Sequence, residues 1–553
     1  MDRPWLNSYP KGINADIDVN KYSSIIDIFE QSIEQYPNNP AFTNFGKTLT
    51  YSQFEIATRS LANYLQHSLA LKKGDRIAIM MPNLLQNPIS IFAALRAGLT
   101  VVNTNPLYTA RELRHQLKDS GAKAIIVIEN FAHTVEKVIE DTDIQHIIIT
   151  KMGDLLGFPK SVLINFAVKY LKKMVPNYSL PNATKFNDAL SEGSKQNFLS
   201  TPLSHQDIAF LQYTGGTTGV AKGAVLTHKN MVANMLQASE WIKNDVKLGK
   251  EIIITALPLY HIFSLTANGL VFMESGAENV LITNPRDFEG FVKELKRTPF
   301  TAITGVNTLF NALINTPGFD QIDFSSLKVT LGGGMSVQPA VAAQWKQITG
   351  CTLVEAFGLT ETSPAVCINP LNINEYNGSI GLPIPSTYCR LVDTEGNIIT
   401  NNEAGELCIK GPQVMREYWN RPEETSEVLS NDGWLRTGDI AKMDGNGYFY
   451  IVDRIKDMIL VSGFNVYPNE IENVIVEHPG VLECGVIGVA DELRGEAVKA
   501  FVVLKDKNLS EQALLSYCKE NLTAYKTPDC IVFIQELPKT NVGKVLRREL
   551  RTL

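Results

Sequence analysis

A glycine- and threonine-rich segment, Tyr213–Gly223, constrains this chain more than any other feature. Its sequence is Tyr-Thr-Gly-Gly-Thr-Thr-Gly-Val-Ala-Lys-Gly, with strand-like segments at Ile208–Tyr213 before it and Ala224–Thr227 after it. Glycines let a backbone turn tightly around an anion and present N–H groups to it, while hydroxyls and the ammonium of Lys222 supply further donors. The segment is not a P-loop, because Lys222 is neither preceded by Gly nor followed by Ser or Thr. We expect a polyphosphate-binding loop between two strands; a flexible surface loop is the alternative.

The length and charge of the chain indicate a multidomain enzyme. Its 553 residues exceed what one hydrophobic core accommodates, and predict roughly three or four structural units. The net charge of -7 and the pI near 5.8 argue against nucleic acid as the main partner, because binding to a phosphate backbone needs a basic surface. We therefore expect small-molecule substrates and no nucleic acid.

Targeting signals and cysteine usage favour a cytoplasmic location. The N-terminus has no apolar segment of signal-peptide length, and the apolar run Pro88–Val102 is interrupted by Arg96. The seven cysteines include no C-x-x-C pair, which suits reduced thiols. A cytoplasmic enzyme is the expectation.

One basic and apolar segment admits a peripheral location on the inner membrane. No acidic residue occurs between Asp154 and Asp188, although five lysines do. Within it, Ser161–Met174 has the pattern of an apolar helix with lysines, which could lie on an anionic membrane surface. A core helix whose lysines reach solvent is an equal alternative.

Alternating helix-like and strand-like segments predict the α/β class. In the first half, helical patterns at Gln53–His67 and Pro88–Leu99 alternate with strand-like segments at 75–81, 122–128 and 146–150. The same alternation returns between Glu251 and Glu355, with strand-like segments at 251–256, 278–282, 300–303 and 327–331. Such alternation is typical of parallel sheets covered by helices, so we expect two α/β subdomains.

The pattern changes twice in the last third of the chain. From about Gly378 to Val452, short strands with Gly, Asp and Asn turns predict a small antiparallel β-barrel. Beyond it, a helix beginning at Tyr467–Glu472, strands at 482–489 and 498–505, and a Ser-capped helix at 510–522 predict a compact α+β domain. We expect a large N-terminal domain at 1–453 and a C-terminal domain at 454–553.

Two further glycine-containing turns carry side chains suited to nucleotide chemistry. Glu355–Pro364 contains one carboxylate in its turn, Glu361, and magnesium is usually held by one or two carboxylates together with phosphate oxygens. Gly332-Gly-Gly-Met335 follows a predicted strand and would let a flat ring or an acyl chain approach the backbone.

Three more segments each offer one functional group. His261 lies among large apolar residues in Pro258–Ser264, Asp439 ends Trp434-Leu-Arg-Thr-Gly-Asp439, and Lys544 lies in a loop of small residues near the C-terminus. Each has a structural alternative: a core histidine, an aspartate that caps a turn, and a solvated lysine. Their order along the chain, together with the glycine-rich loop, favours a functional role for all of them.

That order closely resembles the adenylate-forming superfamily of acyl-CoA synthetases, firefly-type luciferases and peptide-synthetase adenylation domains. The resemblance covers essentially the whole chain, and the block from Ile451 to Glu472 resembles bacterial long-chain fatty-acid–CoA ligases in particular. Members have a large N-terminal domain and a mobile C-terminal domain. One departure is Phe357, where many relatives carry Tyr.

The resemblance implies a role for each matching residue. The ATP-contacting positions would be Tyr213, Thr214, Gly215, Gly216, Thr217, Thr218, Gly219, Lys222, Gly333, Phe357, Gly358, Thr360, Asp439, Arg454 and Lys544. Asp439 would bind the ribose, and Glu361 with Thr218 would hold Mg²⁺. The acyl carboxylate would lie beside Tyr260, His261, Gly332 and Gly333. Lys456 would be the hinge, and the catalytic set would be Lys544, Glu361, His261 and Lys222.

The implied reaction activates a fatty acid with ATP and transfers the acyl group to coenzyme A. The region Pro258–Ser264 has no acid that could pair with the ammonium of an amino-acid substrate, so an apolar acid fits better. One alternative is an acyl-AMP ligase that delivers its product to a carrier protein or to oxygen, although the sequence ends nine residues after Lys544. A catalytically silent lipid sensor or scaffold is another. The oligomeric state is open, and a homodimer is one candidate.

Overall fold

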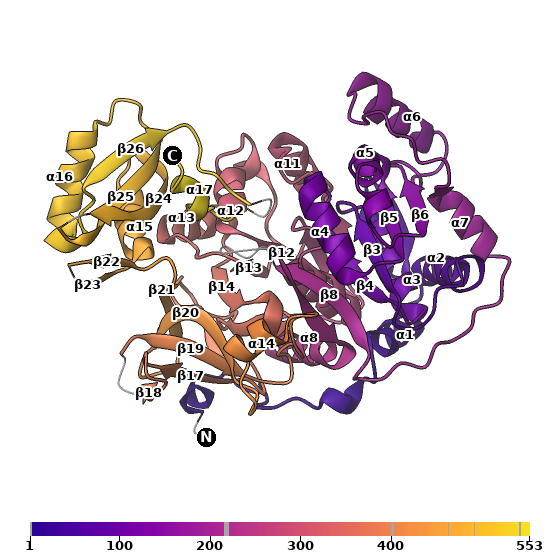
Figure 1. The fold of residues 1–553 in the computed structure, drawn as a ribbon, viewed down its shortest axis with the longest axis horizontal. Coiled ribbons are helices and arrows are strands. Elements are labelled where there is room, and N and C mark those ends of the chain that lie inside the picture. Colours follow the sequence, from indigo (N-terminus) through magenta and orange to yellow (C-terminus); the bar gives the residue numbers. More distant parts are fainter. Residues whose placement is uncertain (1–2, 215–220, 400–402, 463, 492, 541–542) are drawn as a thin grey trace.

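The computed structural model describes residues 3–214, 221–399, 403–462, 464–491, 493–540 and 543–553. In this part of the chain the strands form four sheets, of nine, seven, five and five strands (Figure 1). The seven-stranded and nine-stranded sheets carry most of the helices, and the two smaller sheets follow them in the sequence. The predicted α/β class is confirmed.

The seven-stranded sheet comes from the first α/β segment. Its order is β7 (Thr184–Lys185), β6 (His146–Thr150), β5 (Ala124–Ile128), β3 (Arg76–Met80), β4 (Thr100–Asn103), β8 (Ile208–Thr214), β9 (Lys222–Thr227). Its pairs are parallel except for the hairpin of β8 and β9. The strand β5 is buried along its whole length, which explains its continuous apolar run. The strands expected at 75–81, 122–128 and 146–150 are confirmed within two residues.

The nine-stranded sheet combines distant parts of the sequence. Its order is β16 (Leu382–Pro383), β15 (Ala365–Ile368), β14 (Leu353–Gly358), β13 (Val329–Gly333), β12 (Ala302–Gly305), β10 (Ile252–Thr255), β11 (Glu278–Leu281), β1 (Pro40–Asn44), β2 (Lys47–Thr50). The middle strands are parallel and the outer pairs antiparallel. The sequence predicted the parallel strands between 251 and 331, but not that β1 and β2 complete their sheet.

Helices cover both large sheets. They include α1 (Ile25–Gln35), α2 (Tyr51–Asn63), α3 (Gln86–Arg96), α4 (Ala110–Ser120), α8 (His228–Ile242), α12 (Asn307–Ile314) and α13 (Pro339–Thr349). The helix predicted at Gln53–His67 begins two residues earlier, at Tyr51, where Thr50 and Gln53 form a reciprocal capping box.

An aromatic cluster joins the two large sheets. Phe54 of α2 is fully buried, with its ring centroid 4.9 Å from that of Phe42 on β1, 5.4 Å from Phe29 and 5.5 Å from Phe92. Phe42 belongs to the nine-stranded sheet, whereas Phe29 and Phe92 lie on helices α1 and α3. The two predicted subdomains therefore share one core.

The third sheet is antiparallel, as the turn-rich sequence predicted. Its order is β18 (Ile398–Ile399), β17 (Tyr388–Val392), β19 (Gly405–Lys410), β20 (Leu435–Met443), β21 (Phe449–Arg454). Helix α14 (Pro422–Val428) lies between β19 and β20 in the sequence. Closure of this sheet into a barrel stays a prediction.

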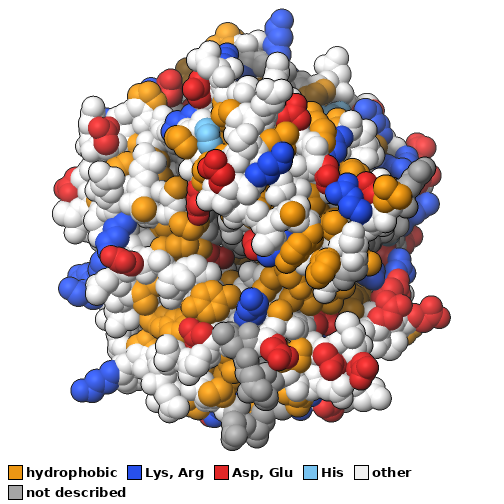
Figure 2. Space-filling model, turned by 90° about the vertical axis from the view of Figure 1, so that its left-hand side faces the viewer, with side chains coloured by type: hydrophobic (Ala, Val, Ile, Leu, Met, Phe, Trp, Pro, Cys, Tyr) orange, Lys and Arg blue, Asp and Glu red, His pale blue; other side chains and the backbone are white. Residues whose placement is uncertain are grey.

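The C-terminal domain is α+β. Its sheet contains β22 (Ile459–Val461), β23 (Phe464–Val466), β24 (Val481–Asp491), β25 (Gly495–Leu504) and β26 (Cys530–Ile534), and its helices are α15 (Pro468–Glu477), α16 (Glu511–Asn521) and α17 (Arg547–Leu550). The predicted cap of α16 is present, because Ser510 Oγ accepts the N–H of Ala513 at 3.2 Å. The boundary at 453/454 stays a prediction; β21 ends there and the chain passes to this sheet. Figure 2 shows the left-hand side of the molecule as it is drawn in Figure 1. Hydrophobic side chains gather across the middle of that face, between the C-terminal domain and the antiparallel sheet of β17 to β21.

The basic, apolar segment forms an exposed helix. Helix α6 (Lys160–Phe166) continues into a π-helical turn, Ala167–Leu171, and Val168 is the one buried residue of the two. In Figure 1 this helix lies at the end of the molecule opposite the C-terminal domain. The core-helix alternative is therefore wrong, because the segment lies on the surface. Among the described residues, no helix has both the length and the apolar character needed to cross a bilayer.

Candidate active site

Some of the predicted site residues meet in a cleft between the N-terminal domain and the C-terminal domain, whereas Lys222, His261 and Glu361 are not among the residues that line it. A cavity of about 670 Å³ lies there. Predicted site residues from both sides line it, namely Phe357, Gly358, Asp439, Arg454, Lys456 and Lys544. The parallel strands β13 and β14 end at this cleft, as ligand-binding strands do in open α/β sheets.

The glycine-rich loop connects the hairpin strands β8 and β9. Thr214 pairs with Lys222 across the hairpin, so the loop between them is closed at its base. Its five central predicted contacts lie outside the described residues, namely Gly215, Gly216, Thr217, Thr218 and Gly219. The hydroxyl of Tyr213 donates to Asp119 Oδ2 at 2.7 Å, so it ties β8 to α4 and is not directed to the loop. A nucleotide contact by Tyr213 stays a prediction.

Lys222 and Glu361 both contact one tyrosine, Tyr418, that the sequence did not single out. The ammonium of Lys222 lies 5.2 Å from the ring centroid of Tyr418, and the hydroxyl of Tyr418 donates to Glu361 Oε1 at 2.7 Å. Glu361 belongs to a short 3-10 turn, Thr360–Thr362, just beyond β14. The phosphate-loop lysine and the predicted metal ligand are thus neighbours, although they are far apart in the sequence.

The ends of β13 and β14 form one wall. Phe357 and Gly358 line the cavity at the end of β14. A Cβ on Gly358 would lie 2.0 Å from the carbonyl oxygen of Pro364, so no other residue fits there without moving the backbone. Gly332 and Gly333 end β13, and the next residue, Gly334, lines the cavity. Their contact with an acyl group stays a prediction.

A buried acid in the same wall was not predicted. Glu355 Oε2 accepts the hydroxyl of Tyr376 at 2.7 Å and the N–H of Val337 at 3.2 Å. Burial raises the pKa of Glu355 to about 7, against the two hydrogen bonds, which lower it. The sequence offered only an acid within an apolar strand as a signal, because its partner Tyr376 lies 21 positions further along the chain.

His261 lies near Lys544 and is held as a neutral ring. Its Nδ1 accepts the N–H of Phe263 at 3.3 Å, and the carbonyl of Tyr260 accepts the side-chain amide of Gln212 of β8 at 2.8 Å. Burial lowers the pKa of His261 to about 4, and the charge of Lys544 lowers it further. A neutral imidazole can donate or accept a hydrogen bond without adding charge.

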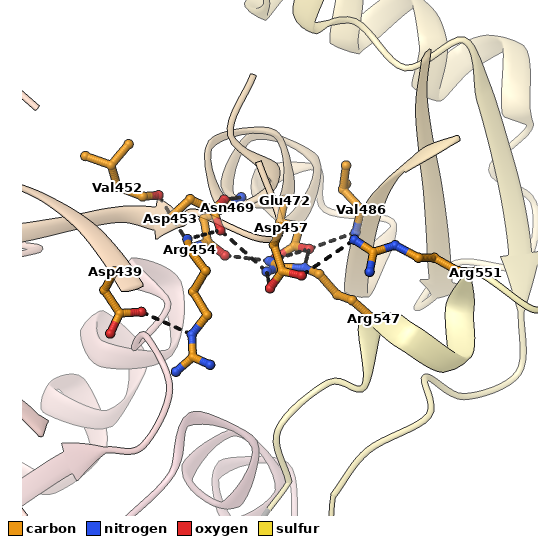
Figure 3. Close-up of polar contacts among 10 residues, drawn as sticks. All are labelled: Asp439, Val452, Asp453, Arg454, Asp457, Asn469, Glu472, Val486, Arg547 and Arg551. Atoms are coloured by element: carbon orange, nitrogen blue, oxygen red, sulfur yellow. Dashed lines mark hydrogen bonds and ion pairs between the residues drawn. The ribbon is translucent and has the colours of Figure 1, made fainter. Parts of the chain in front are cut away.

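Asp439 lines the cavity and keeps one carboxylate oxygen without a hydrogen-bond partner among the described residues. It lies opposite Arg454 on the neighbouring strand, and Arg454 Nε lies 3.1 Å from its Oδ1 (Figure 3). Its Oδ2 is buried without a hydrogen-bond partner among the described residues. Burial raises the pKa of Asp439 even though three cations, led by Arg454, oppose it. An orphaned, buried acceptor fits the hydroxyl groups of a ribose.

The C-terminal domain brings Lys544 into this cleft. A backbone N–H of Thr540 donates to the carbonyl of Lys544 at 2.7 Å, and Lys539 pairs with Glu483 at 2.5 Å, so both sides of the loop are fixed. Gly543 has a φ of +85°, and a Cβ there would lie 2.4 Å from Thr308 Oγ1 of the N-terminal domain. Burial lowers the pKa of Lys544 to about 7, with a further decrease from Arg454.

A partly buried arginine, Arg547, connects the Lys544 loop to the predicted hinge. Arg547 donates to Asn469 at 2.6 Å and pairs with Glu472 at 2.9 Å and Asp457 at 3.3 Å (Figure 3). Asp453, at the end of β21, lies 3.6 Å from it. Lys456 stands between Asp453 and Asp457 in the sequence, and burial lowers the pKa of Lys456. No local pattern distinguishes Arg547 from the other basic residues near the C-terminus.

The donor set fits a magnesium ion held mainly by substrate. Among the residues described, no group of three or more His, Cys, Asp or Glu side chains could enclose a metal. Glu361 supplies one carboxylate whose Oε1 already accepts a hydrogen bond. Magnesium commonly binds one or two carboxylates together with phosphate oxygens and water, so a single acid beside a phosphate loop suits it.

Comparison with known proteins agrees with this geometry. Residues 29–419 match the AMP-binding enzyme family, and residues 470–544 match the AMP-binding enzyme C-terminal domain. A long-chain-fatty-acid–CoA ligase of Escherichia coli O157:H7 is 56% identical over 551 residues, with 100% of this chain and 98% of the relative covered. That of Haemophilus influenzae is 53% identical, with the same coverage.

A solved structure has the same architecture. The anthranilate CoA ligase AuaEII in complex with anthranoyl-AMP superposes with a TM-score of 0.86 at 26% identity, covering 97% of this chain and 98% of that chain. The resemblance inferred from the motif order is confirmed over the full length. The chain belongs to the AMP-binding enzyme family, within the adenylate-forming superfamily.

Proposed function

We propose that this protein is a long-chain fatty-acid–CoA ligase that works through an acyl-adenylate. The observation that carries the proposal is the position of Lys544, which reaches from the C-terminal domain into the cleft lined by Phe357 and Asp439. The full-length relatives of 53–56% identity bear that name, and ATP and CoA are the substrates that such a ligase requires.

In the first half-reaction, an oxygen of the fatty carboxylate attacks the α-phosphorus of ATP. The bond to the bridging oxygen breaks and pyrophosphate leaves. A carboxylate is already a nucleophile, so the protein needs to align two anions and balance their charge. Lys544 and Lys222 are the cations that we assign to this task, and Asp439 would hold the ribose. A magnesium ion bound at Glu361, and at Thr218, would neutralise phosphate charge.

In the second half-reaction, the sulfur of CoA attacks the acyl carbonyl carbon. AMP leaves with the shared oxygen, and the thiol proton passes to solvent. Lys544 occupies the cleft in this structure, so it has to withdraw before the thiol can reach the adenylate. Rotation of the C-terminal domain about Lys456 would withdraw Lys544 from the cleft. The ion pairs of Arg547 with Asp457 and Glu472 would keep the Lys544 loop attached to the rotating domain.

The region beside His261 supports an apolar acid as substrate. Tyr260, Ile262 and Phe263 flank it, and none of these carries a charge that could pair with a polar substrate tail. A buried ammonium without a partner would cost several kcal/mol, which disfavours amino acids. Delivery of the acyl group to a carrier protein or to oxygen is the alternative, and product analysis with and without CoA distinguishes it.

The test measures each half-reaction separately. ATP–pyrophosphate exchange with oleate should occur with the wild type, and addition of CoA should give acyl-CoA and AMP. Lys544→Ala should lose exchange by about a hundredfold or more but still convert supplied oleoyl-adenylate to oleoyl-CoA. Lys456→Pro should keep exchange and lose thioester formation. Loss of both half-reactions in Lys544→Ala would contradict its role, and absence of exchange in the wild type would end the proposal.

We also propose that α6 and the following turn dock on an anionic membrane surface. Of the 19 large hydrophobic side chains that are exposed in the described chain, seven lie between Phe158 and Met174. Phe158 is 89% exposed and Leu171 is 71% exposed. Lysines accompany them without any acid between Asp154 and Asp188. Apolar side chains flanked by lysines suit the boundary between acyl chains and anionic headgroups, where a fatty acid is also found.

Vesicle co-sedimentation tests this surface. Lys169/Lys172→Glu should weaken binding to vesicles that contain anionic lipid by roughly tenfold or more, because each lysine near such a surface contributes about 1 kcal/mol. The matched control is Lys505/Lys507→Glu on the C-terminal domain, where both lysines are exposed. Equal binding by both variants would contradict the proposal. A homodimer stays a prediction, which light scattering on the purified protein would test.

A further inference from the structure

We propose that Tyr418 is a positioning residue that holds Lys222 and Glu361 apart and keeps both directed to the phosphates and the metal. The inference rests on the proposed function, because it takes the roles of Lys222 and Glu361 from it. Tyr418 belongs to no motif of chemical side chains in the sequence, and its position is decided by the fold.

The backbone around Tyr418 connects the two elements that carry these residues. Trp419 N donates to Gly223 O at 2.7 Å and Val225 N donates to Glu417 O at 2.9 Å, so the segment runs along β9 directly after Lys222. At its other end, Met415 N donates to Glu361 O at 2.7 Å. The segment Met415–Trp419 therefore fixes the distance between β9 and the 3-10 turn of Glu361.

A second anchor prevents the segment from sliding. The indole N–H of Trp419 donates to the backbone carbonyl of Asp119 at 3.0 Å, and Arg421 pairs with the carboxylate of Asp119 at 2.8 Å. The same carboxylate accepts the hydroxyl of Tyr213, the residue before the phosphate loop begins. Strand β9 is thus hydrogen-bonded to the residues on both sides of Tyr418. Asp119 connects strand β8 to Trp419 and Arg421.

The side chain of Tyr418 contacts both charged groups at once. Its hydroxyl donates to Glu361 Oε1 at 2.7 Å, and its ring lies under the ammonium of Lys222, 5.2 Å from ring centroid to Nζ. Lys222 and Glu361, both described, form no ion pair with each other within 4.0 Å. A direct pair would satisfy each charge with the other. The neutral hydroxyl instead occupies one carboxylate oxygen, and the ring face attracts the cation, so Lys222 and the second oxygen of Glu361 remain available for ligands.

Two substitutions separate the two contacts. Tyr418→Phe keeps the ring beneath Lys222 and removes the donor to Glu361, whereas Tyr418→Leu removes both. Tyr64→Phe is the matched control, because its hydroxyl also donates to a side-chain oxygen, that of Thr184 at 3.0 Å, on the seven-stranded sheet.

The primary readout is metal binding rather than turnover. Titration of Mn²⁺ into the protein with a non-hydrolysable ATP analogue, followed by the electron paramagnetic resonance signal of free Mn²⁺, should show about tenfold weaker metal binding in Tyr418→Phe. Nucleotide affinity without metal should change by less than about twofold in Tyr418→Phe and weaken by about two- to fivefold in Tyr418→Leu. ATP–pyrophosphate exchange should show the same rise in the Mg²⁺ requirement of Tyr418→Phe, which excess Mg²⁺ restores.

The outcomes are distinguishable. Wild-type Mn²⁺ affinity in Tyr418→Phe would overturn the inference, as would an equal change in Tyr64→Phe. A parallel loss of melting temperature, nucleotide affinity and metal affinity would also overturn it, because it would assign Tyr418 a structural role alone. Failure of the wild type to exchange pyrophosphate would end the proposed function, while the Mn²⁺ titration would still report on Tyr418.

Discussion

Binding of ATP should draw a proton onto Lys544 above neutral pH. In the cleft without nucleotide, burial and the nearby Arg454 lower the pKa of Lys544 to about 7, so its amine is largely neutral at pH 8. The phosphates of ATP are anions that favour the charged ammonium and raise that pKa again. Nucleotide binding and protonation of Lys544 are therefore linked.

The size of the effect follows from the pKa. With a value of about 7, Lys544 carries about 0.1 proton equivalent at pH 8 and about 0.9 at pH 6. If bound ATP restores an ordinary lysine pKa, uptake is about 0.9 proton per ATP at pH 8 and about 0.1 at pH 6. Since only the protonated form binds well, apparent affinity should fall roughly tenfold for each pH unit above 7.

Isothermal titration calorimetry in buffers of different ionisation enthalpy measures this uptake. Lys544→Arg is the control that stays charged, because a guanidinium keeps its proton throughout this range. Lys544→Met has no charge to gain. ATP itself also exchanges protons on binding. Subtracting the proton uptake of each variant from that of the wild type removes this contribution and leaves the uptake by Lys544. If the wild type takes up no more protons at pH 8 than Lys544→Arg does, the reasoning about Lys544 is refuted.

Three further expectations follow from single contacts. Asp439→Asn should raise the KM for ATP in the exchange assay by about ten- to a hundredfold, since it removes the charged acceptor assigned to the ribose; an unchanged KM would exclude that contact. Phe54→Ala should lower the free energy of unfolding by about 3–5 kcal/mol in a urea titration, because Phe54 is fully buried between the two sheets, and a change below about 1 kcal/mol would contradict its role. His261 should stay neutral down to about pH 4. The rate of ATP–pyrophosphate exchange should therefore not fall near pH 6.5 through protonation of His261; a fall there that disappears in His261→Gln would contradict this.

Local signals in the sequence were sufficient for most of the parallel strands and for selecting the candidate site residues, whose roles stay predictions. The alternating apolar segments identified the parallel strands, because buried strands read as continuous apolar runs. The Gly-rich loop was predicted between two strands, and β8 and β9 form that hairpin with Thr214 opposite Lys222. The order of the motifs was sufficient for the family. The contacts of residues 215–220 stay predictions.

Contacts between distant segments were beyond the reach of local patterns. Nothing in Tyr418 or Thr308 distinguishes them from other residues of their type, and they become relevant only because the chain brings β9, the Glu361 turn and the Lys544 loop together. The same holds for the exposure of α6, whose pattern suited a core helix equally well. A periodic pattern records which side chains are apolar, and it does not record what covers them.

The sequence by itself determined the element types, the order of the chemical groups and the family, because those depend on residue identity and spacing along the chain. Only the tertiary structure decided which groups face one another: that Asp439 keeps an oxygen without a partner among the described residues, that burial lowers the pKa of Lys544, and that one tyrosine contacts both Lys222 and Glu361. Burial and pairing depend on the packing of segments hundreds of residues apart. These two properties set the charge of the site, and hence its chemistry.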